Sequence, residues 1–579
     1  MGKIISIKFL LVLIILVASL LRLYKLSVNP PSLFGDELDL GYQAYSILKT
    51  GRDYQGNFMP IHFHSIAEWR TPLYLYSAVP TVAVFGISPL GVRLPAAIFG
   101  ILSVLVIYFL ANELVPKKFG KLNLPFGILP AVFLAISPWH IQYSRAGFEV
   151  TLLLFLLLLG VWLFLKSLKN GKWLWPSVIC LTVTPLVYST AKLFTPALMI
   201  LLFILYRKEI LTLAKKHLIF AAIGGLIIGI PIIYSTVFGG GTQRFNYISV
   251  FSDPTTIPEV GFARQNDARV RGEMGEGLTP NLIDRLIHNK FTFWGDTILK
   301  NYLRGYSTDF LFIKGDPDPR HSVGIGELYR IELIALILGF SLFFLGKEND
   351  KKVKILILFW LLAGVIPSAI TRDGGNHATR LILILPPIIF LVSYGWFEMF
   401  RKVSGRNLFG LASIVCALYL LSISLYIHEY LVHYPWYSER WWHAGWTPAV
   451  KEIKAVDKDY DRVIISMSGE PAWIFFAANY EFDPATWQKE YPIGNDVEVP
   501  GFGSISHIQK FYFGSPDKDT QIYGLGRYID SKTLYLANAK EVGANLIMEP
   551  NRVPEGLKLL KAVPFPSGEP AFYLFAGTR

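Results

Sequence analysis

The chain has 579 residues, of which 52% are hydrophobic and only 17% are charged, and its mean hydropathy is +0.41. These values exclude an ordinary soluble domain and are typical of a protein with many membrane-spanning helices. The net charge of +12 does not indicate a nucleic-acid partner, because Lys and Arg fall in short clusters between apolar segments, where they orient helices. The two cysteines lie inside apolar stretches, so neither a disulfide framework nor a cysteine zinc site is expected.

The first apolar segment, residues 4–26, is about 23 residues long, enough for roughly 35 Å of helix and one membrane crossing. Pro30 and Pro31 follow and stop the helix. Asp36, Glu37 and Asp39 come next, so three carboxylates are predicted at the boundary between water and lipid. Clustered negative charge at such a position needs an explanation.

Two interpretations of Asp36 remain open. In the first it is the N-cap of a helix whose third position is Asp39, a variant of the capping box. In the second it is a carboxylate held rigidly at the head of an interfacial helix, facing a substrate carried by a lipid. One residue can do both.

Eleven membrane spans are predicted, and the basic clusters mark every second boundary. This pattern places those clusters and the N-terminus in the cytoplasm. The segment 72–87 is short and contains Pro80, so an interfacial or re-entrant helix is expected there. The predicted spans are 4–26, 92–114, 124–143, 149–165, 173–189, 192–206, 217–237, 331–345, 354–370, 380–400 and 407–427.

This topology predicts an α-helical polytopic membrane domain over residues 1–428 and a small extracytoplasmic α/β domain over 429–579. The segments outside the membrane are 27–91, 238–330, 371–379 and everything after residue 428. The long polar loop 238–330 is expected to be a partly ordered lid. In the tail, 463–467, 544–549 and 571–576 are predicted strands and 447–458 a helix. The Trp-rich run 435–446 is expected to be an interfacial aromatic belt, with sugar stacking as the alternative.

Charged residues on the predicted outer face form two classes. The carboxylates suit a general base or a metal, and the cations suit a phosphate group. Simpler structural roles are also open for some of these residues. Arg145 and Glu149 have the spacing of an ion pair at a helix end. Arg93, at the start of a span, could be a side chain that snorkels to the interface. The set is Asp36, Glu37, Asp39, Glu68, Arg70, Arg93, Arg145, Glu149, Lys192, Arg372, Asp373, His377 and Arg380.

Five segments together resemble the GT-C glycosyltransferases of the dolichyl-phosphate-mannose protein mannosyltransferase type, which include bacterial lipid A aminoarabinose transferases. The resemblance covers roughly residues 5–400. It is carried by LFGDELDLGYQAYSILKTG, WRTPLYLY, VRLPAAIFG, SPWHIQYSRAGFEVTLLLF and TRLILILPP. It departs before Pro72, where the family often has an acidic or aromatic residue followed by Lys-Pro-Pro and this chain has Trp69-Arg70-Thr71-Pro72, with Glu68 one place further away.

The resemblance implies a membrane-embedded inverting transferase that uses a polyprenyl-phosphate sugar. It matches Asp36 and Glu37 to the family's first-loop acidic pair, with the aspartate as the general base, and Glu149 to the second acidic position. Arg70 and Arg380 match basic positions near the lipid phosphate. Three further residues are candidates for phosphate binding because they are predicted to lie on the outer face: Lys192, Arg372 and His377.

The predicted function is therefore transfer of a sugar to an acceptor hydroxyl of a protein, lipid or glycan. No cofactor is required, because arginines can neutralise the phosphate; a divalent metal is allowed but not predicted. Membrane lipids are expected partners and nucleic acid is not. The alternative function is a transporter or flippase of lipid-linked sugars, which also fits many spans with buried charges.

Overall fold

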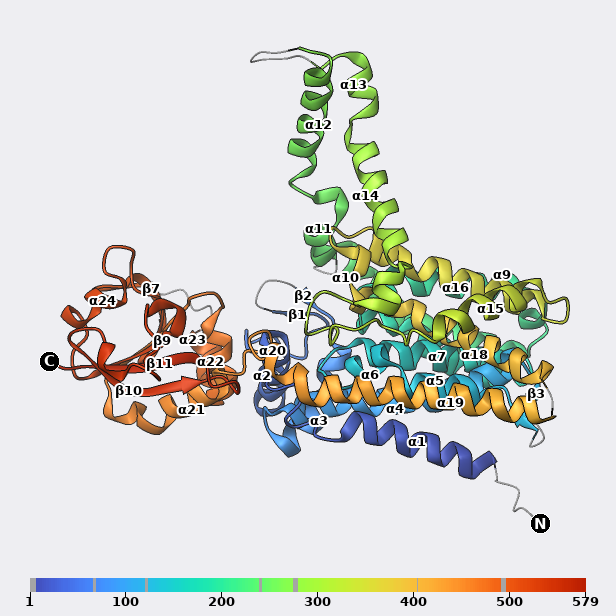
Figure 1. Ribbon diagram of the computed structural model, residues 1–579, viewed down its shortest axis with the longest axis horizontal. Helices are drawn as coiled ribbons and strands as arrows, with labels where there is room; N and C mark the ends of the chain where they lie inside the picture. The colour runs from blue at the N-terminus through green and yellow to red at the C-terminus, as the bar shows by residue number, and fades with distance from the viewer. Residues whose placement is uncertain are drawn as a thin grey trace. The chain divides into compact units, whose positions relative to one another are not determined.

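The computed structural model describes residues 7–65, 69–119, 123–238, 242–273, 280–403, 405–490 and 496–579 (Figure 1). The chain packs into two compact units. Unit 1 comprises Met1–Arg22, Phe99–Tyr143 and Glu149–Leu425, and unit 2 comprises Leu23–Ile98, Ser144–Phe148 and Tyr426–Arg579. Unit 2 thus contains the whole predicted tail together with the first loop, and the domain boundary at 428/429 stays a prediction.

Every range predicted to span a membrane contains helix. The predicted span 124–143 is divided at Ser137, because Pro138 cannot continue the ladder of hydrogen bonds. The helices are α1 Ile7–Leu23, α4 Pro89–Leu114, α5 Ile128–Ile136, α6 Pro138–Ser144, α7 Val150–Ser167, α8 Leu174–Thr182, α9 Ala191–Leu211, α10 Lys215–Phe238, α15 Glu332–Leu345, α16 Lys351–Ala369, α17 Ala378–Leu381, α18 Leu385–Lys402 and α19 Gly405–His428.

The protein is a multi-pass membrane protein. Within the described residues, 6 helical stretches are long and apolar enough to cross a membrane, so the count of eleven spans stays a prediction. These stretches are Pro89–Leu114, Val150–Ser167, Lys215–Phe238, Lys351–Ala369, Ala378–Lys402 and Arg406–Tyr437. The segment 72–87 forms the short helix α3, Leu73–Phe85, which continues past Pro80.

Close backbone packing joins two helices of unit 1. A Cβ atom on Gly339 of α15 would lie 1.8 Å from the carbonyl oxygen of Leu391 in α18, and one on Gly395 would lie 2.1 Å from that of Ala335. Only glycine permits this approach. This close packing holds α18 in position. The short helix α17, which contains Arg380, precedes α18 in the chain.

The long polar loop is largely helical where it is described. It contains α11 Gln243–Ile248, α12 Thr256–Val270, α13 Leu282–Ile287 and α14 Lys290–Arg304, and α12 runs alongside α14 (Figure 1). Asn281 and Asn289 cap α13 and α14 with paired side-chain and backbone hydrogen bonds. These local caps stabilise helices in the loop 238–330, for which the polar composition alone predicted only partial order.

The tail contains the predicted sheet. Its strand order is β10-β11-β9-β5-β8-β7-β6, and β5 is parallel to both of its neighbours, β8 and β9. Two of three predicted strands are confirmed as β5 and β11. The third, 544–549, is wrong: Leu546 is buried, but the segment is a turn held by Tyr573, whose hydroxyl accepts from the Leu546 amide at 2.9 Å. The strands are β5 Arg462–Ile465, β6 Val497–Val499, β7 Gly503–Ile508, β8 Phe511–Phe513, β9 Thr533–Asn538, β10 Leu557–Pro564 and β11 Pro570–Gly577.

The tail also contains helices α21, Trp446–Val456, α22, Ala472–Tyr480, and α23, Pro484–Glu490. Helix α21 confirms the helix predicted at 447–458. The Trp-rich run divides by burial. Trp442 and Trp446 are buried, whereas Trp436 and Trp441 are 59% and 48% exposed. An aromatic belt therefore describes only part of this run.

The tail also packs on α2, Gly35–Thr50, the helix of the acidic cluster. Tyr42 donates its hydroxyl to the carbonyl of Phe482 at 3.2 Å. Gln488 donates its side-chain amide to Ser46 Oγ at 3.0 Å, Thr50 Oγ1 at 2.9 Å and the Asp53 carbonyl at 2.8 Å. These bonds hold the C-terminal end of α2 in unit 2.

Candidate active site

The acidic cluster lies in the first turn of α2. The residue that caps this helix is Phe34, in extended conformation and with no side-chain cap, so the interpretation of Asp36 as N-cap is wrong. The helix begins at Gly35, which places Asp36 and Glu37 inside the first turn. Negative charge there is favoured by the unpaired amides and the helix dipole.

Glu37 is fully committed to a buried ion pair. Its two carboxylate oxygens accept from Arg93 Nε and Nη2, each at 2.7 Å, and both side chains are 0% exposed. The backbone amide of Gly147 donates to the same carboxylate at 2.7 Å. Trp442 covers the Arg93 guanidinium at 5.2 Å from its ring. The expectation that Arg93 snorkels at an interface is therefore wrong, and Glu37 acts as a structural anchor of α2.

Asp36 has the opposite environment, although it is the neighbouring residue. Its carboxylate pairs with Arg70 Nη2 at 2.6 Å, and its side chain is 54% exposed. Arg70 is also fixed on its other side, because its Nε donates to Ser65 Oγ at 3.0 Å. Asp36 is thus an accessible carboxylate with a positioned cation beside it. Glu68 lies outside the described residues.

Asp39 completes this cluster from one turn further along α2. It is buried, accepts from Ser65 Oγ at 2.8 Å and lies 3.6 Å from Arg70 Nε. Burial raises the pKa of Asp39 from 3.8 to about 6, against the opposing effects of the Arg70 charge and the Ser65 hydrogen bond. The sequence analysis did not identify Ser65 as a site residue, because a single serine in a loop belongs to no recognisable motif.

Arg145 and Glu149 flank the start of α7. Arg145 is buried, donates Nη2 to the carbonyl of Asn29 at 2.9 Å and lies over the Tyr430 ring at 4.9 Å. Glu149 is half-buried and is the N-cap residue of α7. The two belong to different units, so the predicted helix-end ion pair stays a prediction.

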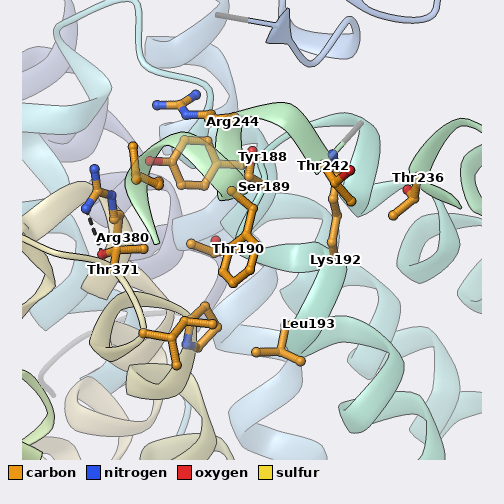
Figure 2. A pocket seen from close by; sticks show the side chains of 14 residues that line it. Tyr188, Ser189, Thr190, Lys192, Leu193, Thr236, Thr242, Arg244, Thr371 and Arg380 are labelled. Carbon is orange, nitrogen blue, oxygen red and sulfur yellow. Dashed lines mark hydrogen bonds between the residues drawn. The ribbon is translucent and has the colours of Figure 1, made fainter. Parts of the chain in front are cut away.

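A cationic pocket lies in unit 1, with a cavity volume of about 240 Å³ (Figure 2). Lys192, Arg244 and Arg380 line it, together with the apolar residues Leu193 and Ile370. Figure 2 shows Arg380 and Thr371 on one side of the pocket and Lys192 on the other. Positive groups and apolar walls therefore meet in one cavity.

Arg380 is held in place by two side-chain partners. It is buried and donates Nη1 to Thr371 Oγ1 at 2.8 Å and to Asp373 Oδ1 at 2.6 Å. Asp373, the partner that the sequence offered, is 68% exposed. Arg244 comes from α11 and lies over the Tyr188 ring at 5.7 Å. The prediction missed Arg244 because it stands among many polar residues of the long loop.

Arg372 lies elsewhere. Its guanidinium donates to the carbonyl of Tyr247 and stacks on that ring at 5.6 Å, and it is not among the residues that line the pocket. The structure thus gives Arg372 a protein partner outside the pocket, and its phosphate-binding role stays a prediction.

His377 belongs to a cluster that could hold a metal. The ligating atoms of Asp316, His321 and His377 lie within 4.8 Å of one another. Asp316 Oδ2 lies 3.0 Å from His321 Nδ1 and accepts from the Ala378 amide at 2.7 Å. Burial, then Arg380, His321 and Arg244, hold the pKa of His377 well below its ordinary value, so its imidazole is neutral, as metal ligation requires. The sequence contains no recognisable metal-binding motif here, because more than fifty residues separate His321 from His377.

The predicted residues thus form separate groups. Asp36, Glu37 and Arg70 lie in unit 2, and Glu149, Lys192, Arg372, His377 and Arg380 lie in unit 1. Within unit 2 the structure brings Asp36 and Arg70 together and separates Glu37 from them by its own pairing. Within unit 1 it joins Lys192 and Arg380 in one pocket.

Comparison with known proteins gives a family match over part of the chain. Residues 70–234 match the family model of dolichyl-phosphate-mannose-protein mannosyltransferases. The dolichyl-phosphooligosaccharide-protein glycotransferase 2 of Pyrococcus horikoshii is 32% identical over 183 residues, which are 31% of this chain and 23% of that relative. The chain therefore spans less than a quarter of the length of this curated relative.

Two solved structures are similar at low identity. One is the oligosaccharyltransferase of Archaeoglobus fulgidus tethered with an acceptor peptide, with a TM-score of 0.49 and 13% identity over 82% of this chain and 63% of that one. The other is ArnT from Cupriavidus metallidurans bound to undecaprenyl phosphate, with a TM-score of 0.47 and 12% identity over 97% of each chain. The predicted resemblance to GT-C glycosyltransferases of the dolichyl-phosphate-mannose protein mannosyltransferase type is confirmed, with the family match over residues 70–234.

Proposed function

We propose that this protein is an integral-membrane inverting glycosyltransferase that moves a sugar from a polyprenyl-phosphate donor to an acceptor hydroxyl on the extracytoplasmic face. The observation that carries the proposal is the cavity in which Lys192, Arg244 and Arg380 meet apolar walls. A lipid phosphate has the same two properties, a compact anion joined to a hydrocarbon chain. Undecaprenyl phosphate, to which ArnT is bound in the solved complex, has this chemistry.

Asp36 is the proposed general base. A hydroxyl has too high a pKa to attack at neutral pH, so a carboxylate must take its proton as the new bond to the anomeric carbon forms. Asp36 is the exposed carboxylate of its cluster, while Glu37 is enclosed by Arg93 and Asp39 is buried. Arg70 lies 2.6 Å from Asp36 and orients its carboxylate.

The leaving group determines the role of the cations. The bond between the anomeric carbon and the phosphate oxygen breaks, its electron pair stays on the phosphate, and the new negative charge needs fixed positive groups. Arg380, anchored by Thr371 and Asp373, is such a group, and Lys192 and Arg244 share its cavity. Attack from the face opposite the leaving phosphate inverts the anomeric centre.

The remaining candidates take supporting roles in this proposal. Glu149 is the second acidic residue of the catalytic set that the resemblance implies. His377, kept neutral by burial, is a hydrogen-bond donor or a metal ligand with Asp316 and His321. The eleven-span topology, with the N-terminus in the cytoplasm and the tail outside, belongs to the same proposal.

The test incubates membranes containing the protein with a panel of polyprenyl-phosphate sugars and measures transfer. We expect Arg380→Ala to weaken binding of undecaprenyl phosphate and to lose most transfer, because its guanidinium is a buried cation of the pocket held by Thr371 and Asp373. Arg372→Ala is the matched control and retains transfer, since its side chain contacts Tyr247 instead. Equal losses in both variants would contradict the assignment of the pocket.

The flippase alternative predicts a different result. An Asp36→Asn variant that moved labelled sugar-lipid across the bilayer at the wild-type rate, in a protein without detectable transfer, would favour transport over catalysis. Labelling of single introduced cysteines at positions 36 and 376 tests the topology. Opposite sides of the bilayer for these positions would contradict the proposed topology.

A further inference from the structure

The sheet of the tail has a crevice that the proposed transfer reaction does not use. Strand β5 lies between two parallel neighbours, and the chain reaches β8 on one side before it reaches β9 on the other. After β5 the chain enters α22, and after β9 it enters the turn that buries Val542 and Leu546. Loops that diverge at the carboxyl ends of parallel strands leave a crevice where ligands bind in open α/β sheets.

A cavity of about 160 Å³ lies at this point. Its polar lining includes Arg440, His443, Glu470, Asn538 and Lys540, and its apolar wall includes Trp446 and Phe565. The volume is far larger than one water molecule needs and smaller than a pocket for a drug-sized ligand. It suits a single small polar unit.

His443 marks this cavity as a built site. Its backbone has φ 51°, a left-handed conformation that costs free energy in a residue other than glycine. Its Nε2 lies 3.1 Å from Glu470 Oε1, and its Nδ1 is buried without a hydrogen-bond partner among the described residues.

The floor beside His443 is preorganised. Glu541 accepts hydrogen bonds from Ser466 Oγ at 2.6 Å, Ser468 Oγ at 2.5 Å and the Tyr535 hydroxyl at 2.6 Å. Ser468 lines the cavity, so one of these fixed hydroxyls faces the ligand space. Arg440 is held over the Phe565 ring at 5.4 Å. Side chains that are fixed before binding lose little entropy on binding.

The mixture of charges selects the ligand. Arg440 and Lys540 would repel a cation, and Glu470 would repel an anion. A sugar hydroxyl can donate to Glu470 and accept from Arg440 or Lys540, and a sugar ring can lie against an aromatic face. We propose that this crevice, defined by Arg440, His443, Glu470, Asn538 and Lys540, binds one neutral carbohydrate unit. Its use as an acceptor subsite rests on the proposed transferase activity, whereas sugar binding itself does not.

The test measures binding separately from transfer. The full chain carrying Asp36→Asn is placed in lipid nanodiscs, and saturation-transfer NMR is recorded with methyl α-mannoside, methyl β-glucoside and N-acetylglucosamine, with glucuronate as the anionic probe. We expect at least one neutral probe to bind, and Arg440→Ala and His443→Asn to weaken it about tenfold. Asparagine tolerates the left-handed backbone, so the second variant removes the imidazole without changing the fold.

Lys558→Ala is the matched control, because Lys558 is an exposed cation of the same sheet outside the cavity, and it should leave binding unchanged. The proposal is overturned if no neutral probe binds above empty nanodiscs, if Arg440→Ala and Lys558→Ala behave alike, or if glucuronate binds more tightly than every neutral probe. In a protein with active transfer, Arg440→Ala should raise the acceptor KM and spare kcat. Loss of transfer in Asp36→Asn with intact sugar binding separates the two proposals.

Discussion

Two ion pairs of unit 2 start from neighbouring residues of one helix and behave differently. Glu37 and Arg93 are both fully buried, and Gly147 and Trp442 enclose them. Asp36 and Arg70 form a pair of similar length, but the aspartate is half open to solvent. A buried pair is costly to break and fixes the backbone, whereas an exposed carboxylate can exchange a proton with a substrate. The degree of burial, more than the residue type, therefore separates the structural role of Glu37 from the proposed catalytic role of Asp36.

The largest effect is expected at the exposed pair. Asp36→Asn keeps the size of the side chain but cannot accept a proton, so the transfer rate should fall by roughly 10²–10⁴-fold. The midpoint of thermal unfolding should stay near that of the wild type, because the side chain is mostly exposed. Transfer assays and thermal unfolding on the same preparation check both statements. Robust turnover would remove Asp36 as the base.

The buried pair should show the reverse pattern. Glu37→Gln leaves the Arg93 charge without its partner and should cost about 3–5 kcal/mol of unfolding free energy. Denaturant unfolding of the purified protein measures this loss. The double variant Glu37→Leu with Arg93→Met should recover part of it, because no buried charge is left alone. Wild-type stability in Glu37→Gln would show that the pair is not an anchor.

Asp39, in the same helix, should make the free energy of unfolding depend on pH. Its pKa is about 6 in the folded protein and 3.8 ordinarily, so the folded state binds the proton more tightly than the unfolded chain. The contribution of Asp39 to stability is therefore fully present below about pH 4 and is lost as pH rises through about 6, with a total of roughly 3 kcal/mol. Unfolding of wild type and Asp39→Asn between pH 4 and 7 should converge at low pH. Parallel curves would contradict the shift.

The smallest effect is expected at the far end of α2. Gln488→Ala removes the amide that bonds Ser46, Thr50 and Asp53 and should cost about 1 kcal/mol. Because this contact joins the tail to the helix that carries Asp36, a modest fall in kcat is also expected. Gln509→Ala, also in the tail, is a comparison variant, and a larger loss there would argue against a specific role of Gln488.

Much of the fold could be predicted because each signal is local. Long apolar runs predicted helix, which every predicted span contains, and short continuous apolar runs predicted β5 and β11. Predictions failed where a neighbour distant in sequence decides the structure. The run 544–549 is apolar enough for a strand, but Tyr573 holds it as a turn. Arg93 has the pattern of an interfacial side chain, but Glu37 and Trp442 enclose it.

The amino-acid sequence by itself determined that this is a membrane protein of many helices with a sheet-containing tail, and it singled out Asp36, Arg70 and Arg380, because hydropathy and short motifs are properties of contiguous residues. Only the tertiary structure decided which charges are available. It buried Glu37, left Asp36 exposed and placed Arg372 against Tyr247. It also added Ser65, Arg244 and the Asp316 and His321 pair to the candidate sites. The physical reason is that solvent exposure and pairing of a charge depend on residues brought beside it by folding.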